Sequence, residues 1–190
     1  TQNLTGDQFL IISLFHGYGG QSYRCVKFNH QFYIFWIDQI SQSIWLNIFT
    51  IVYSKEDKND FPYLSSHGKP RKLTKSIIGN LVGSFELIKG KTLFGLVEIN
   101  NVDYLFQVNI FKENQDLNIL KKFDNFAGSL SSNTTGNLLS WIEWDFPFMP
   151  WENNDLFFAE INEKGELGKN IKLNKEVISS CERISFFQPY

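Results

Sequence analysis

The run Trp141-Ile142-Glu143-Trp144-Asp145-Phe146-Pro147-Phe148-Met149-Pro150-Trp151 holds three of the five Trp residues of the chain and its only Met. Pro147 and Pro150 cannot donate a hydrogen bond to a sheet, so neither belongs in a central strand. Apolar segments flank the run at 138–142 and 156–161. The sequence therefore predicts two strands joined by a rigid aromatic loop.

Short apolar segments separated by turn residues recur along the whole chain, and this pattern is typical of an all-β protein. The aromatic share of 16% agrees with it, because aromatic side chains suit the half-buried surface of a sheet. The segments form three similar units at about 18–74, 80–122 and 124–174, and 175–190 begins another. Propeller blades repeat at roughly 40 to 50 residues. We therefore predict a partial β-propeller of four-stranded antiparallel blades.

Three blades are too few for a closed propeller, which has about four to eight. We therefore expect residues 1–190 to form one domain that is a propeller fragment, with Leu4-Thr5 as the last strand of a preceding blade. The extra length of the first unit predicts a polar loop over 53–68. Because open blade edges invite pairing, the isolated fragment is expected to self-associate.

Charge and hydropathy argue against two classes of partner. The formal net charge is −2 and the basic residues are scattered, whereas nucleic-acid binding needs a basic patch. No segment has the ~20 apolar residues of a membrane span.

The two cysteines, Cys25 and Cys181, are predicted to be free, buried thiols in a reducing compartment. We expect a cytoplasmic protein without nucleic-acid or membrane partners.

The aromatic run also carries a resemblance to a known family. In order and spacing, part of the chain resembles a propeller blade of the dipeptidyl-aminopeptidase/acylaminoacyl-peptidase-like serine peptidases, which belong to the prolyl oligopeptidase family. The matching residues are Trp141 to Asp145, Pro147, Met149 to Trp151, Asp155 to Phe157 and Gly165 to Gly168.

Two shorter matches lie on either side of this blade. His16-Gly17-Tyr18-Gly19-Gly20 resembles the family's His-Glu-Tyr-Gly-Gly, with Gly17 in place of the usual Glu. Phe186 to Tyr190 resembles the opening of the following blade. The resemblance implies a non-catalytic, substrate-gating propeller portion of a serine peptidase-like protein that acts on short peptides. Its partners would be peptides and its own downstream α/β-hydrolase domain. The loss of a carboxylate at Gly17 leaves any inherited binding role there open.

The chemistry of catalysis is not visible in the sequence. It contains no Gly-x-Ser-x-Gly nucleophile elbow, on which the α/β-hydrolases of this family depend. None of the three histidines has the spacing of a triad or of a metal site. We expect no catalytic residue, metal or cofactor in this chain. By resemblance the parent protein would be a hydrolase.

Candidates for substrate-facing residues come from the two motifs. They are His16, Tyr18, Trp144, Asp145, Met149 and Trp151. Each also has a structural interpretation. His16 would pack between blades and hydrogen-bond to backbone, and Tyr18-Gly19-Gly20 would form a tight bend. Trp144, Met149 and Trp151 would form a small core inside the loop.

Further interpretations stay open. Glu143 and Asp145 are paired carboxylates, which suggest glycosidase or metal chemistry; alternatively they would brace the loop through Trp indoles or backbone N–H groups. As a whole, the chain could be a propeller scaffold for protein interactions without a hydrolase domain. It could also be a carbohydrate-binding module that uses Trp144 and Trp151 as stacking platforms.

Overall fold

In the part of the chain that it describes, the computed structural model contains three antiparallel β-sheets and one short 3-10 turn, η1 (Phe15–Gly17). The described residues are 4–17, 20–53, 62–77 and 81–173. Tyr18, Cys181 and the segment 175–190, all named in the sequence-based predictions, lie outside them.

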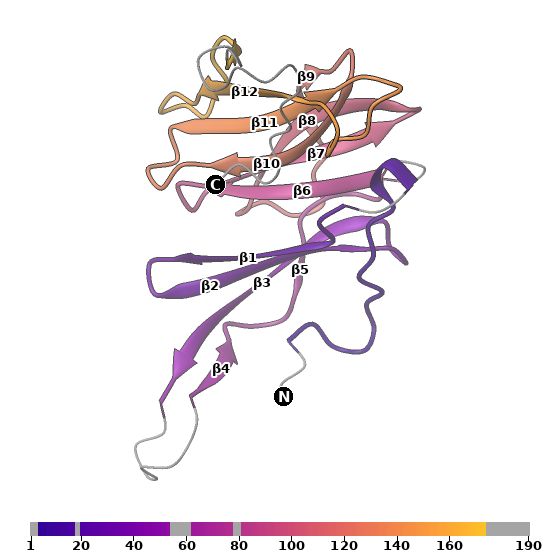
Figure 1. Ribbon diagram of the computed structural model, residues 1–190. Helices are drawn as coiled ribbons and strands as arrows, with labels where there is room; N and C mark the ends of the chain where they lie inside the picture. Colours follow the sequence, from indigo (N-terminus) through magenta and orange to yellow (C-terminus); the bar gives the residue numbers. More distant parts are fainter. Residues whose placement is uncertain (1–3, 18–19, 54–61, 78–80, 174–190) are drawn as a thin grey trace.

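The three sheets follow one another along the chain (Figure 1). The first contains β1 (Tyr23–Phe28), β2 (Gln31–Asp38), β3 (Ser43–Val52), β4 (Tyr63–Ser66) and β5 (Arg71–Lys72). The second contains β6 (Leu81–Ile88), β7 (Thr92–Ile99), β8 (Val102–Asn109) and β9 (Asn118–Lys122). The third contains β10 (Phe126–Ser132), β11 (Leu138–Trp144), β12 (Asp155–Glu160) and β13 (Ile171–Lys172). The strands of the second and third sheets are paired in chain order, which is the pattern of a four-stranded propeller blade.

The first sheet departs from the predicted four strands. β5 pairs with Trp45 and Leu46 of β3, whereas β4 pairs with the other end of the same strand. Figure 1 shows β4 extending away from the rest of the sheets. The loop prediction for 53–68 is therefore wrong in its described part, because β4 continues the long β3 as a hairpin. Leu4-Thr5 was also predicted wrongly, since it forms a bend and Leu4 packs on the first sheet.

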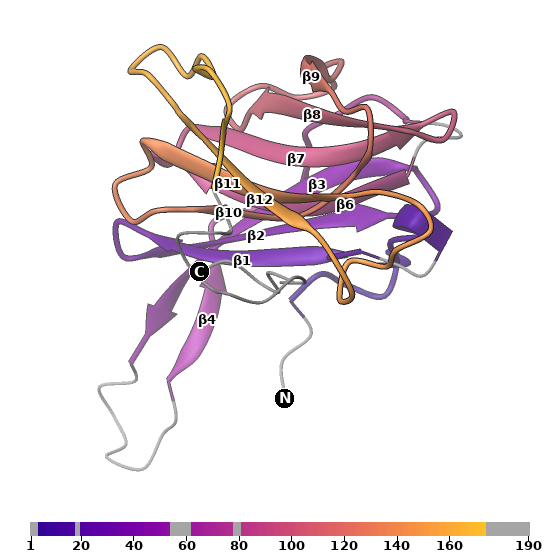
Figure 2. The same ribbon diagram turned by 45° about the horizontal axis from the view of Figure 1, so that its top comes forward.

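The second sheet lies between the other two, and its first strand, β6, contacts both β1 and β10 (Figures 1 and 2). Successive side chains of a strand point to opposite faces. In β7, Leu93 and Val97 therefore enter the core shared with the first sheet, whereas Phe94 and Leu96 enter the core shared with the third. This is the arrangement of adjacent propeller blades, and the described sheets do not close into a ring.

A third apolar cluster covers the outer face of the first sheet. Trp36 and Phe49 lie at its centre, and Phe9 of the N-terminal segment packs against Trp36 with ring centroids 5.1 Å apart. β2 is thus buried on both faces, which explains its unbroken apolar sequence.

Two further observations concern Cys25 and the possibility of a membrane span. Cys25 is exposed on β1, so the prediction of a buried thiol is wrong for this residue. Among the described residues, no helix has the length and apolar character needed to cross a membrane.

Candidate functional site at one end of the blades

The two sequence motifs lie at the same end of the blades. η1 comes just before β1, and the aromatic loop connects β11 to β12. The β7–β8 turn and the β9–β10 connection reach this end as well, because a single pocket is lined by residues from them and from the aromatic loop. We call this end the rim.

His16 joins several parts of the rim. Its ring Nε2 lies 2.7 Å from Oδ2 of Asp103, and its backbone N–H donates to Oε2 of Glu98 at 3.1 Å. The same Asp103 oxygen accepts the backbone N–H of Ala127 at 2.7 Å. The side chains of His16 and Asp103 are only 5% and 3% exposed. η1, β7, β8 and β10 are therefore held together by buried polar contacts, which are costly to break because the groups left behind stay desolvated.

The rings around His16 bring the two motifs into contact. The His16 ring meets Trp144 and Phe126 edge-on, each with a centroid distance of 5.4 Å. Trp144 stacks on Phe126 at 5.8 Å and is only 6% exposed. Edge-on and stacked pairs are the favoured geometries of aromatic rings. His16 and Trp144 are therefore both part of the packing of the rim.

A pocket of about 400 Å³ opens beside this cluster. Its lining includes Asp103, Lys122, Asp124, Phe126, Asp145 and Phe146. Three carboxylate residues and one lysine line it, so the local charge is negative and attracts cations. The two Phe rings add apolar surface. Chemically, the pocket suits a positively charged group with an apolar flank.

The remaining candidates lie apart from the cluster. Met149 is half-buried, and its backbone N–H donates to Oε2 of Glu152 at 2.8 Å. Trp151 is 57% exposed and forms no ring contact within the described part of the chain. The structure therefore brings His16, Trp144 and Asp145 to one place, but it leaves Trp151 on the surface. The stacking platform of two Trp rings is not formed, since Trp144 is buried.

Glu143 and Asp145 have different surroundings. Glu143 Oε1 accepts the indole N–H of Trp141 at 2.8 Å and lies 3.6 Å from the Lys121 ammonium group. The predicted bracing by a Trp indole is confirmed for this residue. Asp145 is exposed and lines the pocket.

His16, Glu98 and Asp103 also form the one group of described residues with the donor set of a metal site. Their ligand atoms lie within 4.8 Å of one another. Nitrogen and carboxylate oxygen suit several divalent transition metals. The hydrogen bonds of His16 already account for this approach, so the geometry does not assign an ion here.

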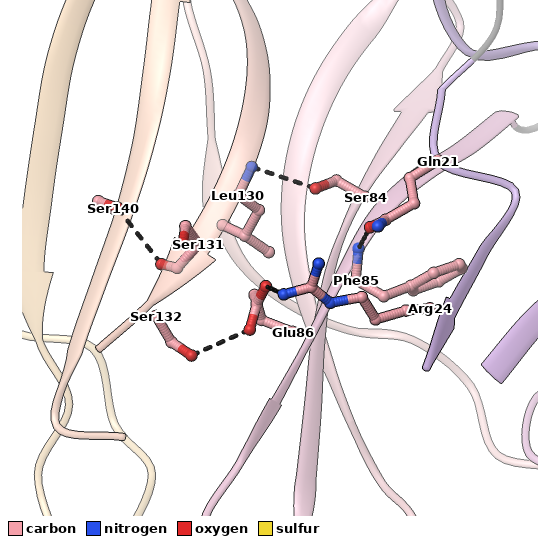
Figure 3. Close-up of polar contacts among 9 residues, drawn as sticks. All are labelled: Gln21, Arg24, Ser84, Phe85, Glu86, Leu130, Ser131, Ser132 and Ser140. Carbon is pink, nitrogen blue, oxygen red and sulfur yellow. Dashed lines mark hydrogen bonds and ion pairs between the residues drawn. The ribbon is translucent and has the colours of Figure 1, made fainter. Parts of the chain in front are cut away.

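Sequence reasoning missed a second polar cluster, which we call the seam, between the first strands of the three sheets (Figure 3). Arg24 Nη2 of β1 lies 2.6 Å from Oε1 of Glu86 in β6, and the Ser132 hydroxyl of β10 donates to Oε2 at 3.0 Å. Burial raises the pKa of Glu86 above its ordinary value of 4.5, against the opposing effects of Arg24 and Ser132. The signal in the sequence was a lone Glu inside the apolar strand Leu81–Ile88.

The fold is similar to that of known peptidases. It matches the crystal structure of puromycin hydrolase with a TM-score of 0.64 and 17% sequence identity, over 87% of this chain and 26% of that chain. It also matches a puromycin-hydrolyzing peptidase of Mycobacterium tuberculosis with a TM-score of 0.65 and 15% identity, over 90% of this chain and 26% of that chain. The chain thus spans about a quarter of the length of these structures.

In sequence, no protein-family model and no curated protein matches the chain. The structural matches are below 25% identity, so they show the fold. The resemblance to the propeller of prolyl oligopeptidase-family peptidases, first seen in the motifs, is confirmed at this level.

Proposed function

We propose that this chain is a substrate-gating portion of the propeller of a serine peptidase-like protein that acts on short peptides. The bond-breaking groups would belong to a hydrolase domain of the same protein. One observation carries the proposal. About nine-tenths of this chain shares its fold with one quarter of two puromycin-hydrolyzing proteins. The printed sequence supports a non-catalytic role, because it lacks the nucleophile elbow.

The rim is the part of the chain that we assign to the gate. Its framework is rigid, since His16 and Asp103 are buried and tied to β10. Its pocket is negative and partly aromatic, which favours a peptide ammonium or basic side chain over an acidic one. The exposed Phe146 and Trp151 project from the neighbouring loop and would narrow the approach for bulky substrates.

The first test is to read the coding sequence past Tyr190 and to express the whole protein. We expect Gly-x-Ser-x-Gly followed by Asp and His. Their absence would overturn the peptidase proposal and leave the scaffold interpretation.

The second test uses that whole protein with Phe146→Ala and with Asp145→Asn. Phe146→Ala should raise kcat/KM for long peptides more than for a dipeptide-sized substrate, since it widens the approach. Asp145→Asn should raise KM for substrates with a free amine while kcat changes little. Tyr63→Ala, an exposed aromatic on β4, is the matched control. Unchanged ratios in both rim variants would contradict a gate at this position.

Two other expectations belong to the same proposal. In isolation the fragment should self-associate through its open blade edges, and light scattering should detect a species larger than 22.2 kDa. A stable monomer over a wide concentration range would contradict it. A cytoplasmic location is proposed along with the peptide-processing role, and fractionation of the source cells tests it.

A further inference from the structure

The segment that leads into η1 crosses from the first sheet to the second without forming a strand of either (Figure 1). Every second residue of 9–15 is buried or half-buried, whereas Leu10, Ile12 and Leu14 between them are 45%, 40% and 45% exposed. Among the described residues, the segment forms a single isolated β-bridge, which joins Ile11 to Asp38. We call residues 4–11 the strap and residues 13–16 the anchor, because different contacts hold them.

The strap covers the outer face of the first sheet with one aromatic ring. Phe9 is half-buried, and its ring centroid lies 5.1 Å from that of Trp36 and 4.9 Å from that of Trp45. Trp36 is fully buried, and its indole N–H has no hydrogen-bond partner in the part of the chain that the structure describes. A buried donor without a partner is costly. Since Phe9 packs against this ring, closing the strap helps to maintain that cost.

Two hydrogen bonds attach the strap to the end of β2 and to the turn that follows it. The backbone N–H of Leu10 donates to Oδ1 of Asp38 at 3.0 Å, and the carbonyl of Leu10 accepts the N–H of Gln39 at 2.8 Å. Asp38 also accepts the backbone N–H of Ile40 and both the N–H and the hydroxyl of Ser41. Lifting the strap therefore leaves this carboxylate with other donors, which lowers the cost of opening.

The anchor is held by buried contacts. The Ser13 hydroxyl donates to the carbonyl of Val82 at 2.6 Å and accepts the N–H of Gly20 at 3.2 Å. Phe15 is 4% exposed and packs directly on Gly83, where an added Cβ would lie 2.7 Å from its ring. Moving the anchor would break these contacts and those of the rim. In the strap, by contrast, every residue is half-buried or exposed.

We propose that the strap is a lid on the outer face of the first sheet, which opens about a hinge at Ile12 while the anchor and the rim stay in place. Ile12 lies between the two sets of contacts, and its side chain is 40% exposed. The open lid makes Trp36 and Trp45 accessible without disturbing the candidate gate. The opening is a conformational device of the fold and does not depend on the proposed peptidase role.

Hydrogen exchange of the full wild-type chain, followed by NMR, tests the proposal. The amides of Leu10 and Gln39 lie in different segments, but they should have the same protection factor, because one opening breaks both hydrogen bonds. This protection should be lower than that of the His16 and Ala127 amides by about tenfold or more, since local openings cost less than larger ones. Low concentrations of urea should change it little, because opening the lid exposes little surface.

A variant of the strap gives a second measurement. Phe9→Ala should accelerate exchange of the Leu10 and Gln39 amides by about tenfold or more, since it removes the aromatic contact of the strap, and it should leave the His16 amide unchanged. Phe28→Ala is the matched control. Phe28 is a half-buried ring at the opposite end of the first sheet, packed against the core shared with the second sheet. It should leave the exchange of the strap amides unchanged.

Several results would overturn the proposal. Equal protection of the Leu10 and His16 amides in the wild type would show that strap and anchor open as one unit, and so would equal acceleration of both in Phe9→Ala. Different protection factors for Leu10 and Gln39 would exclude a single opening. If Phe9→Ala does not fold, Phe9→Leu, which removes the ring but stays apolar, provides the same comparison. Protection that rises with protein concentration would also overturn the proposal, since the strap would then cover a second copy of the chain.

Discussion

The two halves of the aromatic run, 141–144 and 145–151, both carry large aromatic side chains but lie in opposite environments. Trp141 is fully buried and Trp144 is 6% exposed, whereas Phe146 is 87% and Trp151 is 57% exposed. The boundary falls at Asp145, the first residue after β11. Apolar character alone therefore did not decide burial. What decided it was whether the residue lies in a strand that has a sheet packed against its face.

The contacts explain the difference. Trp141 stacks on Phe157 at 6.2 Å, meets Phe123 edge-on at 6.1 Å and donates to Glu143. In the loop half, the backbone N–H of Phe148 donates to the carbonyl of Asp145, and that of Glu152 donates to the carbonyl of Met149. These are bonds within the loop. The buried half, in contrast, contributes Trp141 to the core between the second and third sheets.

The largest effect is expected from Trp141→Ala. Removing a fully buried indole leaves a cavity and takes one hydrogen-bond donor from Glu143, and we expect a loss of about 3–5 kcal/mol in the free energy of unfolding. Urea denaturation followed by circular dichroism measures it. Trp141→Phe, which keeps a ring, should lose clearly less. An effect of Trp141→Ala as small as that of a surface substitution would remove the distinction between the two halves.

The second largest loss of stability is expected from His16→Ala. It tests whether the buried half is anchored to the rim, because it leaves Asp103 buried with one donor fewer and takes a ring away from Trp144. We expect a loss of about 1–3 kcal/mol, typical of a buried group deprived of its partner. A double-mutant cycle with Trp144→Phe measures the coupling. If the two losses in the free energy of unfolding simply add, the contact between His16 and Trp144 contributes no stability of its own.

Glu86→Gln tests a buried charge in the seam instead of a buried aromatic ring. Because burial raises the pKa of Glu86 in the folded protein, that state binds more protons than the unfolded chain above pH 4.5. Stability from this group is therefore present at low pH and falls as pH rises toward the raised pKa. The wild type should lose stability relative to Glu86→Gln across this window. Chemical denaturation at several pH values checks it, and a pH-independent difference would contradict the buried seam.

The smallest effect is expected from Trp151→Ala. A side chain that is 57% exposed and lies outside the cores should change the free energy of unfolding by no more than about 0.5 kcal/mol. The same variant tests the carbohydrate interpretation. Millimolar sugar should leave the Trp fluorescence of the wild type unchanged, and quenching that disappears in Trp151→Ala would favour a sugar site.

Much of the fold was readable because strand signals are local. Alternating or continuous apolar segments separated by turn residues predicted the strands, which pair in chain order in the second and third sheets. The wrong predictions arose because a short segment carries no information about the strands that lie beside it. β4 has a polar, largely exposed sequence, and it is a strand because β3 continues beside it. Cys25 is apolar in character, but it lies on β1 and is exposed, because no other described sheet packs against that face of the first sheet.

The candidate site was also predicted only in part. Sequence motifs pointed to His16, Trp144 and Asp145, and these do meet at one rim. Sequence gave no indication of Asp103 as the partner of His16, or of Arg24 as the partner of Glu86. These residues lie far apart in the chain, and strand periodicity carries no information about which side chain will face which across two packed sheets.

The sequence by itself determined that this protein is built of repeated β-strands and where its chain turns, because both follow from local backbone preference and apolar spacing. Only the tertiary structure decided which aromatic rings are core and which are surface. It also decided which carboxylates are paired and buried. Those properties arise when sheets pack face to face, since packing removes water from one side of a strand and brings distant polar groups within hydrogen-bonding distance.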